Sequence, residues 1–121
     1  MAGKEAVIFA VDCGGSMVPH MDVARSVIKT IMTQKMLQSK QNEMGIIMFG
    51  LPEDQTSNVL HDQDQEGYKG IKEVSGLERG SVDLLRSLSV IQAVEEEGGA
   101  SDLLDAMIVG VHMIHQRTQK L

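Results

Sequence analysis

Aromatic residues are nearly absent from this chain of 121 residues, which has no tryptophan and only Phe9, Phe49 and Tyr68. Because proteins that bind single-stranded nucleic acid stack bases on aromatic side chains, we do not expect such stacking here. Positive charge is also scarce: 11 Lys and Arg stand against 17 Asp and Glu, giving a net charge of −6. We therefore expect any contact with DNA to come through a partner or other sequence, not through this chain.

A single cysteine, Cys13, excludes an internal disulfide bond and fits a reducing compartment. No apolar run reaches the roughly 20 residues that a membrane-spanning helix needs, and residues 1–5 lack the shape of a signal peptide. We therefore expect an intracellular protein that does not enter a membrane. Methionine, in contrast, is abundant, with nine residues that suit the filling of gaps in a core.

An apolar run at residues 6–11 leads into Asp12, two glycines and Ser16, and a long amphipathic segment follows. The run does not alternate and is rich in β-branched and aromatic residues, which predicts a central strand buried on both faces. Open α/β sheets bind their ligands at the carboxyl ends of such strands. Asp12 therefore marks the first candidate site.

The remaining segments are defined by hydrophobic periodicity or by its loss. They are a helix over 19–39, a buried strand over 43–49, a long acidic loop over 51–67, a weak edge strand over 68–74 antiparallel to the second strand, and helices over 81–94 and 101–116. A right-handed βαβ crossover places the first helix on one face of the sheet, and the last two helices are expected on the other. The predicted fold is α/β, a doubly wound and mostly parallel sheet. We expect residues 1–121 to form a single, partial domain, truncated after the third major helix.

The order of four short motifs points to a family. They are Val-Asp-Cys-Gly-Gly-Ser-Met at 11–17, Gly-Ile-Ile-Met-Phe-Gly at 45–50, Asp-Leu-Leu at 83–85 and Ser-Asp-Leu-Leu-Asp-Ala-Met-Ile-Val at 101–109. The first motif resembles the start of a von Willebrand factor A domain. The ordered set resembles the N-terminal domain of the large subunit of the Ku heterodimer.

The resemblance implies a non-enzymatic docking domain that serves DNA double-strand-break repair by non-homologous end joining in the nucleus. The implied partners are the small Ku subunit, the DNA-dependent protein kinase catalytic subunit and repair factors with short peptide motifs. DNA would be bound only through the rest of the Ku ring, and no cofactor is implied. Two alternatives stay open: a magnesium-dependent, ligand-binding von Willebrand factor A domain, and a doubly wound enzyme such as a phosphotransferase.

In the von Willebrand factor A family, Asp-x-Ser-x-Ser and a distant Thr and Asp hold a divalent metal. Asp12 and Ser16 match two of these ligands and Ser101 falls near the threonine, but Gly14 stands where the first serine should be. Because Mg²⁺ prefers six oxygen ligands, we expect this degenerate site to bind it weakly or not at all. Asp12 is instead expected to accept hydrogen bonds from loop amides, and Ser16 to cap the first helix.

Other chemistries also find little support in this sequence. Phosphotransfer at Asp12 would need a second carboxylate where Gly14 stands, and the glycine-rich loop lacks the lysine of a P-loop. Cys13 has no supporting base beyond a nearby histidine, so a buried or loop thiol is favoured over a nucleophile. His112 and His115 are expected on the solvated face of the last helix.

The second candidate site is the acidic loop with the start of the edge strand. Leu60 and Tyr68 are expected to line an apolar pocket that Asp62, Asp64 and Glu66 surround with negative charge. Such a surface suits a basic and hydrophobic peptide, so these side chains form the predicted docking site. The simpler alternatives are a solvated, mobile loop and a tyrosine that only packs the end of a strand.

Overall fold

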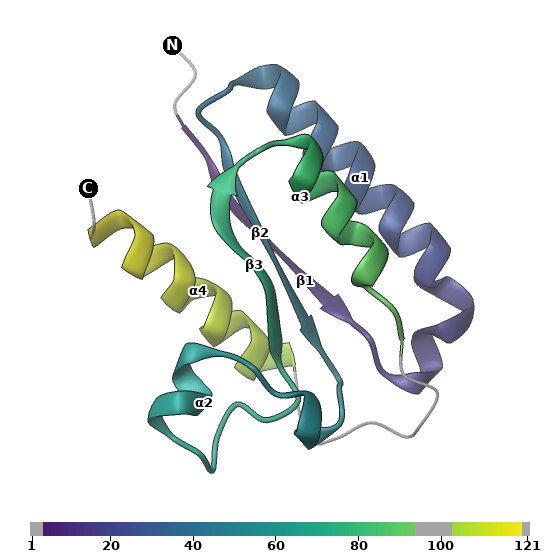
Figure 1. Cartoon of the computed structure of the whole chain (residues 1–121), viewed down its shortest axis with the longest axis vertical. Helices are drawn as coiled ribbons and strands as arrows, with labels where there is room; N and C mark the ends of the chain where they lie inside the picture. The colour runs from purple at the N-terminus through teal and green to yellow at the C-terminus, as the bar shows by residue number, and fades with distance from the viewer. Residues whose placement is uncertain (1–3, 94–102, 120–121) are drawn as a thin grey trace.

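The computed structural model describes residues 4–93 and 103–119, which form a three-stranded sheet with helices on both faces (Figure 1). In chain order the elements are β1 (Ala6–Asp12), the 3-10 helix η1 (Gly15–His20), α1 (Met21–Gln38), β2 (Glu43–Phe49), η2 (Glu53–Gln55), α2 (Val59–Gln63), β3 (Lys72–Arg79), α3 (Val82–Arg86), η3 (Ser87–Val90) and α4 (Leu103–Gln119). The predicted α/β class is confirmed. No helix in the described ranges has the length and apolar character needed to cross a membrane.

β2 is the central strand, and every one of its residues is buried. It pairs in parallel with β1 along its whole length, from Ala6 opposite Glu43 to Asp12 opposite Phe49, and antiparallel with β3. Its unbroken apolar stretch suits a strand covered on both faces. The expectation that the first strand is central is wrong for the described chain, because β1 pairs with β2 alone and so lies at an edge.

The antiparallel edge strand is present, but it starts later than predicted. β3 begins at Lys72 and ends at Arg79, whereas the pattern predicted residues 68–74. Ser75 and Gly76 have the composition of a turn, but both lie within β3. The register between β2 and β3 is irregular there. Tyr68 therefore lies before the strand, with a positive φ of 58°.

The two faces of the sheet carry different helices. Helices α1, α3 and η3 share one face (Figure 1). Their buried side chains there are Met21, Ile28, Met32, Leu84 and Leu88. Helix α4 covers the other face. Its buried side chains are Ala106, Val109 and Met113.

The prediction that the last two helices share a face is therefore wrong for α3. The turn after β3 returns the chain beside the C-terminal part of α1, where Gly80 lies so close to Met36 that a Cβ would have no room. This contact directs the chain onto the α1 face before α3 begins. Ser81 then caps α3, since its side chain accepts a hydrogen bond from the amide of Leu84 at 3.1 Å.

Glu43 brings a charge into the start of the central strand, where its side chain is only 2% exposed. Its carboxylate accepts hydrogen bonds from Arg117 Nε at 3.1 Å and Nη2 at 2.8 Å, and Lys4 Nζ lies 3.4 Å away. Pairing with Arg117 lowers the pKa of Glu43, against the opposing effect of burial. The bidentate pair thus joins β2 to the C-terminal end of α4.

The lowered pKa of Glu43 predicts a pH-dependent stability. The contribution is present above the unfolded-state pKa of glutamate, about 4.3, and is lost as the pH falls through the lower folded-state pKa. We expect Glu43→Gln to lower the melting temperature by several degrees at neutral pH, and this difference to shrink in acid. Thermal unfolding followed by circular dichroism over a series of pH values measures it. The exposed Glu78→Gln is the matched control, and a deficit independent of pH would contradict the prediction.

Candidate functional site

Asp12 lies at the carboxyl end of β1, where the first two strands leave the sheet together. The amide of Cys13 donates to the carbonyl oxygen of Phe49 at 2.8 Å. Asp12 Oδ1 accepts a hydrogen bond from the amide of Gly14 at 2.9 Å. The prediction that a loop amide holds this carboxylate is confirmed.

Two glycines allow the loops after β1 and β2 to approach the Asp12 carboxylate closely, although Asp12 itself stays exposed to solvent. Gly50 has a φ of +76°, and a Cβ there would lie 2.8 Å from Asp12 Oδ1 and 2.9 Å from the nitrogen of Gly14. A Cβ at Gly14 would lie 3.3 Å from the same oxygen. Glycine is therefore needed at position 50 on two grounds, its backbone conformation and the close approach of the carboxylate.

The residues around Asp12 do not fit a magnesium site. Mg²⁺ prefers near-octahedral coordination by oxygen, whereas the matched positions offer one hydrogen-bonded carboxylate and the hydroxyl of Ser16. Ser101, the third predicted ligand, lies outside the described residues. Among the residues that the structure describes, no three or more His, Cys, Asp or Glu side chains are grouped to hold a metal ion.

The predicted role of Ser16 as a helix cap is wrong. Ser16 lies inside η1, whose N-cap residue is Gly14, and α1 begins only at Met21. The predicted start at Pro19 falls within the same 3-10 helix. The glycine loop therefore leads into an extra, tighter turn before the α-helix, because residues 15–20 use the 3-10 hydrogen-bond pattern.

Cys13 is a fully buried thiol, as the sequence predicts. Burial raises its pKa to about 12, the charge of Asp12 adds to the rise, and Arg25 opposes it. Since the thiolate is the nucleophilic form of cysteine, this environment suppresses its reactivity. Cys13 therefore belongs to the core rather than to a catalytic site.

The acidic segment at 51–67 has its own structure, so its interpretation as an unstructured loop is wrong. It contains η2 and α2, and Ser57 ties it to the start of β3. The Ser57 amide donates to the carbonyl of Ile71 at 3.0 Å, and its carbonyl accepts from the amide of Glu73 at 2.9 Å. These bonds to the sheet fix the backbone on either side of α2.

Asn58 organises this segment and was not identified from the sequence. Asn58 is only 4% exposed. The oxygen Oδ1 caps α2 by accepting from the amide of His61 at 2.9 Å, and Nδ2 donates to the carbonyls of Tyr68 at 3.0 Å and Ile71 at 2.9 Å. An N-cap asparagine is detectable in a sequence, but its two bonds beyond the helix are not.

The structure brings together the predicted docking residues in part. Leu60 and Tyr68 are both half-buried and pack against the same hydrophobic cluster on the α4 face. Asp62, Asp64 and Glu66 are exposed on α2 and the turn that follows it. The predicted place of Tyr68 in the edge strand is wrong, because the residue lies in the turn before β3.

The two histidines of α4 lie in different environments. His115 is exposed, as expected. His112 Nε2 is buried and finds no hydrogen-bond partner among the described residues, so the expectation of a solvated face is wrong for this ring. The reason is its position between Val109 and Met113, which face the sheet.

The close approach of Gly50 to the Asp12 carboxylate predicts that two glycines respond differently to the same substitution. We expect Gly50→Ala to reduce the free energy of unfolding by about 1–3 kcal/mol, because it strains the backbone and crowds the carboxylate. Gly76→Ala is the matched control, since a Cβ at this strand position would meet no atom within 4 Å. Urea unfolding measures both, and equal losses would contradict the proposed crowding at Asp12.

The incomplete oxygen set predicts the response to magnesium. We expect titration calorimetry with MgCl₂ to show no saturable heat that depends on Asp12, because too few oxygen ligands converge. Asp12→Asn serves as the control for nonspecific heats. Tight binding that this substitution abolishes would overturn the prediction.

A sequence model of the Ku70/Ku80 N-terminal alpha/beta domain matches residues 6–121. "X-ray repair cross-complementing protein 5" of Dictyostelium discoideum is 29% identical over 128 residues, covering 96% of this chain and 15% of the relative. "ATP-dependent DNA helicase 2 subunit KU80" of Oryza sativa subsp. japonica is 26% identical over 114 residues, covering 92% and 15%. "ATP-dependent DNA helicase II subunit 2" of Neurospora crassa is 28% identical over 132 residues, covering 100% and 18%.

The chain thus spans between 15% and 18% of the length of these relatives. The family match, in contrast, covers nearly all of this chain, from the first residue of β1 onward. The architecture agrees with it, since helices cover both faces of a sheet that begins with a parallel pair of strands. The chain belongs to the family of Ku N-terminal α/β domains.

Proposed function

We propose that this chain is a non-enzymatic docking domain of a Ku large subunit that serves DNA double-strand-break repair by non-homologous end joining in the nucleus. Membership of the Ku family supports the connection with repair, as does the word "repair" in the name of the Dictyostelium relative. The proposed partners are the small Ku subunit, the DNA-dependent protein kinase catalytic subunit and repair factors with short motifs. DNA would be contacted by the rest of the Ku ring.

The chemistry around Asp12 supports docking over catalysis. The carboxylate is exposed, but it accepts a hydrogen bond from the Gly14 amide and lies close to the backbone of Gly50. The neighbouring Cys13 is buried with a raised pKa. Two relatives are named as subunits of ATP-dependent helicases. We place no such activity in this chain, because its glycine loop lacks the lysine with which a P-loop holds phosphates.

The observation that carries the docking proposal is the surface built by α2 and the following turn. It consists of Leu60, Tyr68, Asp62, Asp64 and Glu66, and we call it the acidic docking surface. A partner peptide would place apolar side chains against the first two residues and basic side chains near the carboxylates. Charge complementarity of this kind raises the association rate and selects the partner.

Asn58 gives the acidic docking surface a fixed shape before any partner arrives. Its one side chain holds the first turn of α2 and the backbone of Tyr68, so Leu60 and the tyrosine ring keep a set spacing. A preformed site loses less conformational entropy on binding than a mobile loop would. Asn58 is therefore a positioning residue for the proposed site.

A labelled peptide of alternating lysine and leucine tests this site by fluorescence anisotropy. We expect Tyr68→Ala to weaken binding about tenfold, since a large aromatic anchor is lost. Asp62→Asn with Glu66→Gln should weaken it about fivefold, because two attractive charges are removed. Both substitutions leave the hydrogen bonds of Asn58 in place.

The charge-matched control is Glu78→Gln with Asp83→Asn, two exposed carboxylates outside this surface. This control removes the same net charge as Asp62→Asn with Glu66→Gln. It should change the affinity by less than about twofold, because its two carboxylates lie outside the acidic docking surface. Circular dichroism establishes that each variant is folded. An unchanged affinity in folded Tyr68→Ala, or an equal loss in the control, would reject the proposed site.

A further inference from the structure

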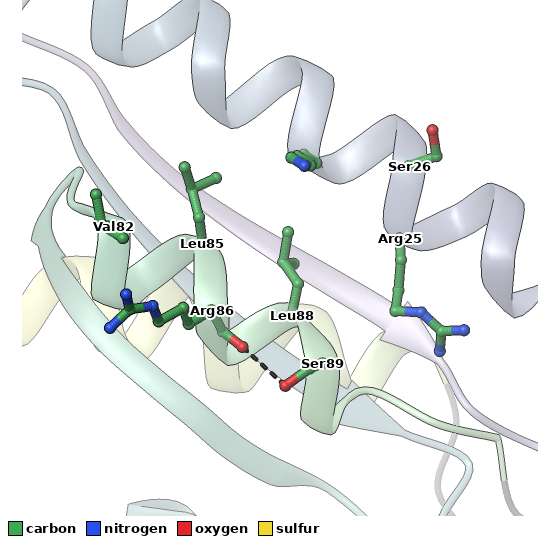
Figure 2. A pocket seen from close by; sticks show the side chains of 8 residues that line it. Arg25, Ser26, Val82, Leu85, Arg86, Leu88 and Ser89 are labelled. Atoms are coloured by element: carbon green, nitrogen blue, oxygen red, sulfur yellow. Dashed lines mark hydrogen bonds between the residues drawn. The ribbon is translucent and has the colours of Figure 1, made fainter.

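A groove lies on the face of the sheet opposite to α4, between α1 and the short helices α3 and η3 (Figure 2). It has a volume of about 510 Å³. The acidic docking surface packs with α4, whereas this groove belongs to the α1 face. The two surfaces therefore do not overlap.

The wall that α3 and η3 contribute is apolar. Leu85 and Leu88 point from these helices toward α1 (Figure 2). Leu88 is buried in the core and Leu85 packs against it, which fixes this wall. Val82 extends the apolar surface and is 61% exposed, so it is free to contact a ligand.

The polar side of the groove is cationic. Arg25 and Lys29 come from α1, one turn apart, and Arg86 comes from α3. Among the residues that the structure describes, no carboxylate lines the groove, although the chain carries a net charge of −6. The groove is therefore positively charged, whereas the acidic docking surface is negatively charged.

The three cations differ in their availability. Arg25 is held in place, since Nη1 donates to the carbonyl of Ile91 at 2.5 Å and Nη2 pairs with Asp22. Arg86 pairs loosely with Asp83, at 3.7 Å between exposed side chains. Such an exposed pair contributes little and is easily replaced.

Lys29 is exposed and makes no ion pair with the described residues. Lys29 lines the groove from α1 and Arg86 lines it from α3, so both can receive an anionic group. Carboxylates on a ligand would replace the water around these two cations. The apolar wall would bury side chains of the same ligand, which adds to affinity in proportion to the area covered.

We propose that this groove binds a short acidic segment of a partner protein, with its carboxylates at Lys29 and Arg86 and its apolar side chains on Val82 and Leu85. The combination of an apolar wall with few cations favours a peptide over nucleic acid, which requires many phosphate contacts and aromatic stacking. The site is independent of the acidic docking surface.

Fluorescence anisotropy of the full chain with a labelled peptide of alternating glutamate and leucine tests the proposal. We expect saturable binding that weakens with salt. Lys29→Glu with Arg86→Glu should weaken it about tenfold or more, because two attractions become repulsions. Lys40→Glu with Lys72→Glu is the control of equal charge, at exposed lysines outside the groove. It should change the affinity by less than about twofold, since distant exposed charges are screened.

Two further experiments test the contribution of the apolar wall and the location of the bound peptide. A peptide of alternating glutamate and serine should bind at least about fivefold more weakly than the glutamate–leucine peptide, because it buries no apolar side chain. A photo-crosslinker on Ser89→Cys should attach the glutamate–leucine peptide, and the buried Cys13 leaves the new thiol as the accessible one.

Asp62→Asn with Glu66→Gln should leave this binding unchanged, which separates the groove from the acidic docking surface. Three results would each overturn the proposal: no saturable binding of the glutamate–leucine peptide, equal losses in the groove and control variants, or equal affinity for the serine peptide. Circular dichroism establishes that the variants are folded.

Discussion

The rest of the structure depends on the complete burial of β2. Every residue of this strand is covered, so the chain must supply one neighbouring strand on each side and helices on both faces. The single charge within it, Glu43, is tolerated because Arg117 binds both carboxylate oxygens. The same pair fixes the end of α4, so the helix on one face and the start of the central strand are held by one interaction.

The carboxyl ends of β1 and β2 form the edge at which open α/β sheets bind their ligands. The loop after β2 approaches the loop after β1 so closely that Gly50 and Gly14 both lie beside the carboxylate of Asp12, which stays exposed to solvent. The aspartate then serves to hold a loop amide. We therefore place the proposed recognition surfaces on the outer faces of the domain and not at this edge.

Those outer faces carry surfaces of opposite charge. On the α4 face, Asn58 holds a preformed turn that presents carboxylates beside Leu60 and Tyr68. On the α1 face, Lys29 and Arg86 flank an apolar wall. A domain of this design could hold two segments of different chemistry at the same time, because the sheet separates the two sites. Such an arrangement suits a docking role without chemistry of its own.

The sequence by itself determined the strand at 43–49, the first strand to within one residue and the long first helix, because periodicity and β-branched content are local properties. It also predicted an antiparallel third strand, although the strand begins four residues later than expected. It also identified the buried Cys13 and the hydrogen-bonded Asp12. Only the tertiary structure decided that β2 is central, that α3 lies beside α1, and that Asn58 joins α2 to the turn at Tyr68. These depend on contacts between residues distant in the chain, such as Gly80 against Met36, and no local pattern specifies them.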